Sequence, residues 1–412
     1  MIDLALLRAE PERVSALILK KDPTFAVKRL IELDERVRQM RHTLEELRAE
    51  KNECAKLAQR GLTPELRERS VLLGEQIKKA EADLAGLEAE FKDLYLGCPN
   101  LLSDEVQAGG KEANITVRSF GAQPEFGYPP KTHVELGKAL GWLDFEAAAL
   151  MAASNFVLYR DRAVLLQYAL EMFMLQTARE HGFSPVLPPF LINERSLEGA
   201  SNFPRFREDV YAVEKDGLFL TPTAEVNLAN LYRDHIFALE ELPMRLTALT
   251  SCFRREAGGY GASERGLIRI HQFDKVELFT LCAPGKSPQE QERMLACAES
   301  ILQRLDLHYR VTLLAAQDCS FPSAKTYDIE VWMPGQKEYK EVSSVSNCTD
   351  FQARRCAIRY RPEQNEKPRL VHTLNGSSLA LPRLVVALLE SGQQADGSIV
   401  FPEVLKSVTI GV

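Results

Sequence analysis

The sequence lacks the segments that would place a chain in or across a membrane. Its 412 residues contain no apolar run of about 18 residues, the length that a membrane-spanning helix needs. The first residues, Met1 to Ala5, also lack the basic start and apolar stretch of a secretion signal. We therefore expect a cytoplasmic protein with no membrane partner.

Metal-binding patterns are also missing. The eight cysteines form no CxxC pair and the seven histidines form no HxxxH pair, so no structural zinc site is expected. An isolated histidine such as His271 is then expected to be a hydrogen-bonded structural residue. The net charge of −7 argues against nucleic-acid binding through diffuse basicity, although a local basic face stays open.

The common glycine-rich nucleotide loops are absent. Pro284 to Ser287 ends like a P-loop, but Thr280 occupies the position of the first glycine. The stretch Gly258 to Gly261 lacks the GxGxxG spacing and opens no obvious helix. ATP would have to be held in another way, and arginine suits this because its planar guanidinium can both grip phosphate and stack on a base.

A heptad pattern occupies residues 27 to 60 and resumes at residue 66. Gly61 and Pro64 between the two stretches are typical of a helix end and a helix start. So short a turn forces the helices to run antiparallel, which predicts a coiled-coil hairpin over about 27–96. The pattern alone leaves a dimerisation or spacer role open. The seam consists of Leu30, Leu33, Val37, Met40, Leu44, Leu47, Lys51, Cys54 and Ala58, then Leu66, Ser70, Leu73, Ile77, Ala80, Leu84, Leu87, Phe91 and Leu94.

The rest of the chain mixes helices and strands. Glycines and prolines gather between 97 and 131, where we place a domain boundary. Because strand-like segments often follow one another directly, we expect an α+β fold with a mainly antiparallel sheet flanked by helices. Helices are predicted at 163–181, 287–305 and 382–392, and strands at 186–187, 245–249, 275–279, 309–314 and 328–332.

Two strand-like segments flank the glycine-rich loop. Strand alternation would let Arg254 and Glu256 point into one pocket, and would do the same for Arg269, Phe273 and Glu277. One wall of that pocket would carry charge and an aromatic plane. Taken alone, an Arg-x-Glu pair is more often a solvated surface ion pair.

Five segments follow the predicted arm in a fixed order. They are HGFSPVLPPF at 181–190, TPTAE at 221–225, the stretch from FRRE at 253 to Phe279, EVSS at 341–344, and HTLNGS at 372 through Glu390. In this order they resemble the bacterial-type seryl-tRNA synthetases, a family of class II aminoacyl-tRNA synthetases. The resemblance runs through nearly the whole chain, including the arm.

The resemblance implies a domain plan. An N-terminal tRNA-binding domain would cover 1–104, with the helical arm at about 27–96, and a class II catalytic domain would cover 105–412. Motif 1 would lie at about 163–191 and build a homodimer interface. Motif 2 would lie at about 250–279 and motif 3 at about 372–391.

The implied function is a ligase that activates L-serine with ATP and transfers the seryl group to tRNA(Ser). Whether tRNA(Sec) is a second substrate stays open. Two alternatives also remain. An inactive paralogue serving as a structural or RNA-binding dimer would be expected to have lost an arginine or the metal glutamate. A ligase that charges a carrier protein would lack the arm and use zinc.

The resemblance also assigns site residues. Arg254, Arg383 and Glu341 would be catalytic, because joining a carboxylate to a phosphate needs charge neutralisation rather than a protein nucleophile. Glu341 and Ser344 would hold Mg²⁺. The ATP site would comprise Arg254, Arg255, Glu256, Arg269, Ile270, Phe273, Glu341, Val342, Ser343, Ser344 and Arg383. The serine site would comprise Thr223, Ala224, Glu225, Arg254, Glu277, Asn375 and Ser377.

Within these sites the resemblance implies particular partners. Glu256 would meet the adenine amino group, Arg269 the γ-phosphate and Glu277 the serine ammonium. Phe273 and Arg383 would sandwich the adenine. The chain departs from many relatives at Ser378, at Val345 and at Ala262 to Glu264 in the motif 2 loop.

Overall fold

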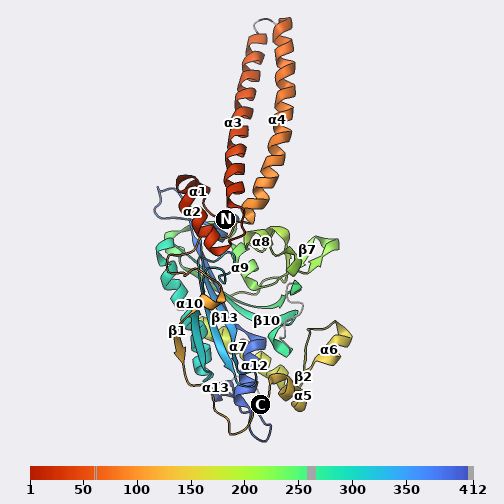
Figure 1. Cartoon of the computed structure of the whole chain (residues 1–412), viewed down its shortest axis with the longest axis vertical. Helices are drawn as coiled ribbons and strands as arrows, with labels where there is room; N and C mark the ends of the chain where they lie inside the picture. The colour runs from red at the N-terminus through yellow and green to blue at the C-terminus, as the bar shows by residue number, and fades with distance from the viewer. Residues whose placement is uncertain (60, 62, 258–265, 407–412) are drawn as a thin grey trace. The chain divides into compact units, whose positions relative to one another are not determined.

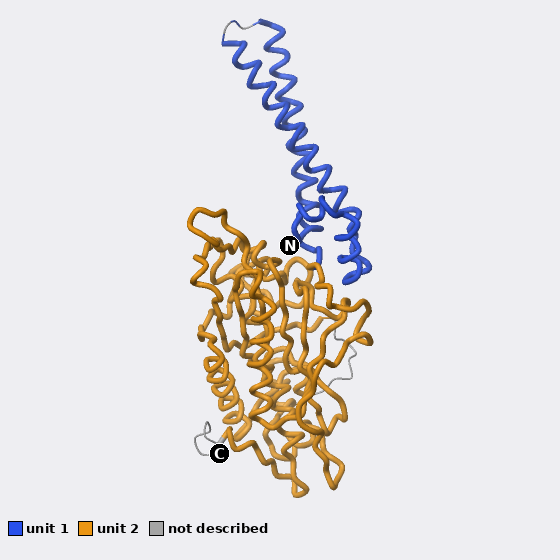
Figure 2. The backbone as a smooth tube through the Cα atoms, turned by 90° about the vertical axis from the view of Figure 1, so that its left-hand side faces the viewer, with its two compact units in different colours: residues 1–99 blue, residues 100–412 orange. Residues whose placement is uncertain are grey.

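Figure 1 shows the computed structural model of the chain, which describes residues 1–412 except 60, 62, 258–265 and 407–412. The chain forms two compact units, Met1–Pro99 and Asn100–Val412, which Figure 2 colours separately. Among the described residues, no helix is both long and apolar enough to cross a membrane.

The first unit is helical. It contains α1 (Leu4–Ala9), α2 (Pro11–Lys21), α3 (Val27–Ala58) and α4 (Pro64–Leu96). The two long helices run antiparallel, which confirms the predicted hairpin (Figure 1). Pro64 is the first residue of α4, and the Thr63 hydroxyl caps the helix by accepting from the Leu66 N–H at 3.3 Å. Leu62, in the predicted turn, lies outside the described residues.

The predicted seam holds the hairpin together. Val37 and Leu44 of α3 are buried against Ile77, Ala80 and Leu84 of α4. Toward the tip, the seam positions Lys51, Cys54, Leu66 and Ser70 are only half-buried or exposed. Burial of apolar area therefore stabilises the base of the hairpin more than its tip.

The second unit is built on an eight-stranded sheet in the order β1-β11-β12-β13-β16-β10-β9-β4. Its neighbours are antiparallel except β4 and β9, which confirms the predicted mainly antiparallel α+β fold. The strands are β1 (Ile115–Phe120), β4 (Ser184–Pro185), β9 (Met244–Phe253), β10 (Gln272–Cys282), β11 (Tyr309–Leu313), β12 (Lys325–Met333), β13 (Glu338–Thr349) and β16 (His372–Ala380).

Smaller strands and the helices surround this sheet. The helices are α5 (His133–Leu140), α6 (Phe145–Met151), α7 (Arg162–Glu180), α8 (Glu194–Gly199), α9 (Ala224–Leu231), α10 (Ser287–Arg304), α11 (Phe351–Cys356), α12 (Leu381–Gly392) and α13 (Glu403–Lys406). In a two-stranded sheet, β2 (Leu143–Asp144) pairs with β3 (Leu158–Tyr159). In a three-stranded sheet, β7 (Leu218–Leu220) lies between β5 (Leu191–Asn193) and β6 (Ala212–Val213). In another three-stranded sheet, β14 (Arg359–Arg361) lies between β8 (Ile236–Ala238) and β15 (Arg369–Leu370). Short 3-10 turns are η1 (Lys111–Ala113), η2 (Arg207–Asp209), η3 (Glu214–Asp216), η4 (Leu239–Glu241), η6 (Gly266–Ile268) and η7 (Pro284–Lys286).

Strand β10 is covered on both faces. Val276 and Leu278 belong to an apolar cluster with α7, α10 and α12. Phe279 and Leu281 belong to a second cluster with α8, α9 and α11. Because successive side chains point to opposite faces, Phe273, Lys275 and Glu277 share the face of Phe279. This second face is the one on which the pocket described below opens.

The three predicted helices correspond to α7, α10 and α12, but the predicted hairpin around the glycine-rich loop is shorter than expected. Strand β9 ends at Phe253 and β10 begins only at Gln272. Past Phe253, Arg254 N–H still donates across the hairpin, to the His271 carbonyl at 2.9 Å. Arg255 N–H donates instead to the Asp209 carbonyl at 2.8 Å and His271 N–H to the Asn155 carbonyl at 2.9 Å. The glycine-rich stretch and Ala262 to Glu264 lie outside the described residues.

Candidate active site

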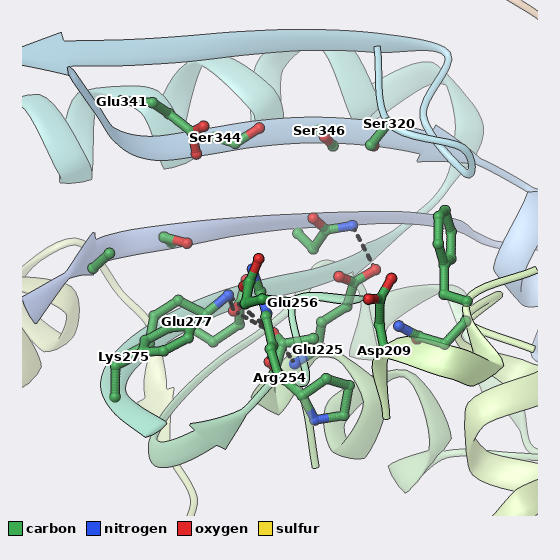
Figure 3. Close-up of a pocket in the computed structure, with 18 of the residues that line it drawn as sticks. Asp209, Glu225, Arg254, Glu256, Lys275, Glu277, Ser320, Glu341, Ser344 and Ser346 are labelled. Atoms are coloured by element: carbon green, nitrogen blue, oxygen red, sulfur yellow. Dashed lines mark hydrogen bonds and ion pairs between the residues drawn. The ribbon is translucent and has the colours of Figure 1, made fainter. Parts of the chain in front are cut away.

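A pocket of about 640 Å³ opens over the middle of the large sheet (Figure 3). That volume suits a small-molecule ligand of nucleotide size. Its walls bring together segments that are far apart in sequence. Of the predicted site residues, those that line it are Thr223, Glu225, Arg254, Glu256, Arg269, Ile270, Phe273, Glu277, Glu341, Val342, Ser344, Asn375, Ser377 and Arg383.

Three predicted site residues lie outside the lining. Ala224 is fully buried at the first position of α9. Ser343 is buried and donates its hydroxyl to the Ser377 carbonyl at 2.5 Å. Arg255 turns its guanidinium over the ring of Tyr211, 5.7 Å from the ring centre.

A bulge in β13 brings Glu341 to the pocket. Ile329 pairs with Ser343 whereas Glu330 pairs with Glu341, so Val342 is the extra residue. Without the bulge Glu341 and Ser344 would lie on opposite faces, because their spacing is odd. With it, both point into the pocket (Figure 3).

A buried charge pair forms the floor of the pocket. Lys275 Nζ makes an ion pair with Glu277 Oε2 and donates to Thr223 Oγ1 at 2.9 Å. The Thr223 hydroxyl donates to the same Oε2 at 2.9 Å. All three residues are buried, and buried charges persist only when paired and hydrogen-bonded. Sequence reasoning missed Lys275, although it lies midway in the period-two series from Phe273 to Glu277.

Glu225, which is half-buried, is the second acid of the pocket. Its Oε1 accepts from Gln352 Nε2 at 2.6 Å and from Asn375 Nδ2 at 3.0 Å. Burial and then the neighbouring Glu277 together raise the pKa of Glu225 to about 7. Gln352, which sequence reasoning also missed, is held by Thr373, whose hydroxyl donates to it at 2.8 Å. No sequence pattern marks Gln352, since it comes from the distant helix α11.

Three arginines also line the pocket, and each is held by contacts within the chain. Arg254 Nε donates to the Pro222 carbonyl at 3.1 Å, and its guanidinium lies 5.2 Å from the centre of the Phe273 ring. Arg269 pairs with Glu256 at 2.6 Å. Arg383 Nη1 donates to the Glu341 carbonyl at 2.7 Å. A guanidinium has about five N–H donors, so these contacts leave further donors for an anion.

Two more residues fix the start of the motif 2 segment. Asp209 accepts from Arg255 N–H at 2.8 Å and, through Oδ1, from Ala257 N–H at 3.0 Å. His271 Nδ1 lies 2.9 Å from the Arg254 carbonyl, which confirms the expectation of a hydrogen-bonded histidine. Sequence reasoning missed Asp209, because no local pattern ties it to the residues that it holds.

The oxygen atoms of Glu341 and Ser344 are the ligand type that Mg²⁺ prefers. Beside them, Asp328 Oδ1 is buried with no hydrogen-bond partner in the part of the chain that the structure describes. Burial, and then the nearby Glu341, raise the pKa of Asp328 well above its usual range. Within the described residues no three His, Cys, Asp or Glu side chains cluster as a metal site. With only Glu341 and Ser344 as expected protein ligands, the site fits an ion that takes its other ligands from the phosphates of ATP.

Comparison with known proteins agrees with this picture. Residues 1–102 match the family model of the seryl-tRNA synthetase N-terminal domain, and residues 210–392 match the class II tRNA synthetase core domain of the G, H, P, S and T group. A serine-tRNA ligase of Acidithiobacillus ferrooxidans is 47% identical, covering 98% of this chain and 97% of its own. One from Geobacter sulfurreducens is 43% identical, covering 98% of each.

A solved structure is similar over the same length. The seryl-tRNA synthetase of Pyrococcus horikoshii, complexed with ATP, has a TM-score of 0.91 at 36% identity and covers 99% of this chain and 98% of its own. The antiparallel sheet and its arginine-lined pocket thus define a class II aminoacyl-tRNA synthetase. Within that class, the chain belongs to the seryl-tRNA synthetase family.

Proposed function

We propose that the chain is a serine-tRNA ligase, which joins L-serine to ATP as seryl-adenylate and then transfers the seryl group to tRNA(Ser). The observation that carries the proposal is that one pocket is lined both by three arginines and by the acids Glu225 and Glu277. The arginines suit phosphates, and the acids suit a small ammonium-bearing molecule. The relatives named above support the choice of serine.

In the activation step, the serine carboxylate attacks the α-phosphorus of ATP and pyrophosphate leaves. Arg254 and Arg383 would neutralise the charge that gathers on the phosphate oxygens, and the pocket would hold the reacting atoms in line. Glu341 and Ser344 would hold Mg²⁺, which supplies additional positive charge to the phosphates when bound. No protein nucleophile is required, since the substrate carboxylate is the nucleophile.

The adenine would lie between Phe273 and Arg383, with Glu256 at its amino group. Arg269 would contact the γ-phosphate through N–H donors that its pair with Glu256 leaves unused. An arginine held by a carboxylate in the same pocket is oriented before the nucleotide arrives, which lowers the entropic cost of binding.

Serine would be recognised by the two acids of the pocket. Lys275 and the Thr223 hydroxyl both contact Oε2 of Glu277, which leaves Oε1 for the substrate ammonium. The serine hydroxyl would bond to polar groups that include Asn375 and Ser377. Alanine would be rejected because those groups would lose their partner, and larger side chains would not fit.

We further propose that residues 1–104 bind tRNA through the helical arm, that residues 105–412 carry the chemistry, and that the enzyme works in the cytoplasm, where it supplies translation.

We also propose a homodimer. Helix α7 exposes Leu165, Tyr168 and Met172 with exposed fractions of 45%, 62% and 49%, and these residues lie at helical spacing on one stripe. Such a stripe suits a subunit interface. Light scattering at micromolar concentration should give about twice the mass of one chain.

Other apolar residues of α7 face inward. Leu166, Leu170 and Phe173 are buried in the core of the protomer, as are Ala169 and Met174. Leu165, Tyr168 and Met172 face outward. The helix is thus apolar on both its inner and its outer side.

A pair of assays tests the proposed function against its alternatives. Serine-dependent exchange of pyrophosphate into ATP and charging of tRNA(Ser) should both occur, and tRNA(Sec) can be added as a second acceptor. An inactive paralogue would show neither reaction. A carrier-protein ligase would show exchange without charging. Absence of exchange with serine would overturn the proposal.

A further inference from the structure

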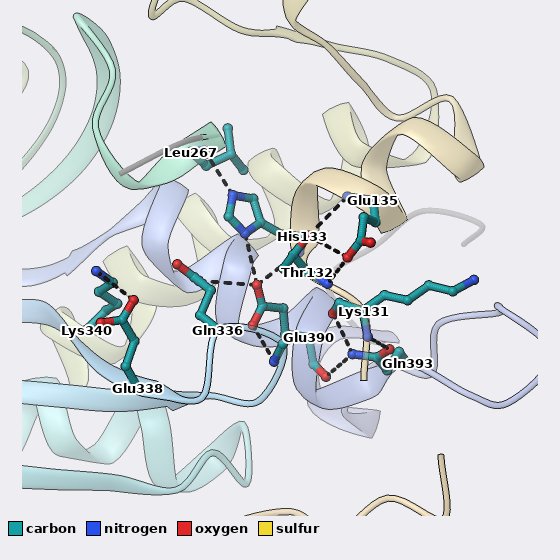
Figure 4. Close-up of polar contacts among 11 residues, drawn as sticks. Lys131, Thr132, His133, Glu135, Leu267, Gln336, Glu338, Lys340, Glu390 and Gln393 are labelled. Atoms are coloured by element: carbon teal, nitrogen blue, oxygen red, sulfur yellow. Dashed lines mark hydrogen bonds and ion pairs between the residues drawn. The ribbon is translucent and has the colours of Figure 1, made fainter. Parts of the chain in front are cut away.

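A buried histidine lies beside the proposed ATP site without lining it. His133, at the start of α5, and Glu390, in α12, are both almost fully buried. His133 Nδ1 lies 2.9 Å from Glu390 Oε1, and His133 Nε2 accepts from the Leu267 backbone N–H at 3.1 Å (Figure 4). The ring therefore joins the motif 3 helix to the turn η6.

These contacts fix the tautomer of His133. A backbone N–H is always a donor, so Nε2 must be the unprotonated acceptor toward Leu267. Nδ1 then carries the hydrogen and donates to Glu390. The same carboxylate also accepts from the backbone N–H of His133 and of Gly335, each at 2.9 Å, which fixes its position.

Helix α12 thus holds η6 at two successive residues. Arg383 Nε donates to the Ile268 carbonyl at 3.4 Å, and Glu390 acts through His133 on the Leu267 N–H. Arg383 and Glu390 are two helical turns apart and so lie on the same side of α12. Leu267 and Ile268 both line the pocket, so their position shapes the part of it where ATP is proposed to bind.

The ring of His133 packs so closely against η6 that no side chain fits between them. Gly266 has a φ of +71°, and a Cβ there would lie 2.2 Å from His133 Nε2. The approach is therefore possible only for glycine, which tolerates this backbone conformation and has no side chain. His133 sits directly against the first residue of η6.

We propose that His133 is a positioning residue for ATP binding. It transmits the rigid position of α12 through Glu390 to the Leu267 N–H, and so keeps η6 and Arg383 in register around the adenine and phosphates. The inference rests on the proposed ATP site, but the histidine itself touches no substrate.

Two substitutions separate the two hydrogen bonds of the ring. His133→Asn keeps a donor near Nδ1 for Glu390 but is too short to accept from Leu267. His133→Gln places an amide oxygen near Nε2, where it can accept from Leu267. We expect His133→Asn to raise the dissociation constant and KM for ATP about five- to tenfold, equal to about 1–1.4 kcal/mol. The KM for serine should stay within about twofold, and His133→Gln should restore most of the ATP affinity.

His308→Asn is the matched control. His308 is also bonded through both ring nitrogens, to the Phe120 carbonyl at 2.7 Å and to the Tyr339 hydroxyl at 2.8 Å, but it does not line the pocket. The His308→Asn variant should leave ATP binding unchanged while lowering the melting temperature about as much as His133→Asn does. If His133→Asn does not fold, Gly266→Ala replaces it, because it displaces η6 from an intact His133 and should weaken ATP binding in the same way.

Calorimetric titration with ATP, beside thermal melts, reads out these variants. Unchanged ATP affinity in folded His133→Asn, or equal losses for ATP and serine that follow the melting temperature, would show a purely structural role. Failure of the wild-type chain to bind ATP would instead overturn the proposed function. The two failures are therefore distinguishable.

Discussion

The arm and the pocket are both rich in charge, but they hold it differently. Across the hairpin, Arg41 pairs with Glu88 at 2.6 Å, with exposed side-chain fractions of 59% and 41%. In the pocket, Lys275 pairs with Glu277 at exposed fractions of 8% and 2%. Arg48 and Glu81 repeat the exposed arrangement at 2.7 Å.

The difference separates scaffold from site. An exposed ion pair contributes about 0–1 kcal/mol and is screened by salt, so the arm depends on its apolar seam for stability. A buried pair is costly to desolvate and is often replaceable by apolar residues without loss of stability. The buried charges of the pocket are therefore best explained by a charged ligand, whereas those of the arm keep it solvated and available to a partner.

Removing the arm should have the largest effect, because it should separate the activation of serine from the charging of tRNA. Deleting residues 28–96 and closing the gap should leave serine-dependent pyrophosphate exchange within about threefold, because the hairpin packs on itself within a separate unit. Charging of tRNA(Ser) should fall by more than about 100-fold, a loss of about 2.7 kcal/mol or more. If the truncated chain charged tRNA with unchanged efficiency, the arm would be a spacer.

Arg383→Lys tests the pocket with charge conserved. Lysine loses the planar stack and the fork, so the activation rate should fall about 30- to 1000-fold, or about 2–4 kcal/mol. The melting temperature should stay within about 2 °C, because the side chain is partly exposed and serves the ligand. Exchange kinetics beside a thermal melt decide the point. A near wild-type rate or a collapsed melt would mean that the ATP site is misplaced.

Glu225 gives the pocket a pH dependence near neutrality. Its pKa, raised to about 7 by burial and by Glu277, means that it loses its charge as the pH falls below neutrality. The neutral form attracts the serine ammonium less, so the KM for serine should rise about tenfold between pH 8 and pH 6. In Glu225→Gln the profile over this range should be nearly flat. An equally steep profile in the variant would exclude Glu225 as the titrating group.

The same raised pKa sets the sign of the stability effect. Between the ordinary glutamate pKa near 4.5 and about 7, the folded chain keeps a proton that the unfolded chain has released. The contribution of Glu225 to the free energy of unfolding therefore falls as the pH rises through this window. Denaturant titrations measure this effect. From pH 5 to pH 8, the free energy of unfolding of the wild type should fall relative to that of Glu225→Gln, and a relative rise would contradict the assignment.

The smallest effect is expected in the arm. Arg41→Ala should lower the free energy of unfolding by no more than about 1 kcal/mol, and less at high salt, because its partner Glu88 remains solvated. Denaturant titration at about 50 mM and 500 mM salt measures it, with Glu88→Ala, which breaks the same pair from the other side and leaves Arg41 unpaired, as the control. A loss above about 2 kcal/mol would mean that these pairs stabilise the arm as the seam does.

The sequence was sufficient where structure depends on local periodicity. The hairpin, its turn and helices α7, α10 and α12 follow from heptad spacing and from glycine and proline placement. Local patterns predicted one wall of the pocket, and its other residues were assigned only through the resemblance to the seryl-tRNA synthetases. The bulge at Val342, the Gln352 contact and the His133 link depend on pairings between distant segments, which no local pattern encodes. Lys275 could have been found from strand alternation alone.

Exchange of pyrophosphate into ATP by the full chain, with each of the twenty amino acids in turn, tests the central claim most directly. Serine should support exchange, alanine should be rejected for lack of the hydroxyl, and amino acids with larger side chains should be excluded by size. Exchange driven by another amino acid in preference to serine, or by none, would contradict a site built from Glu225, Glu277 and the three arginines to activate serine.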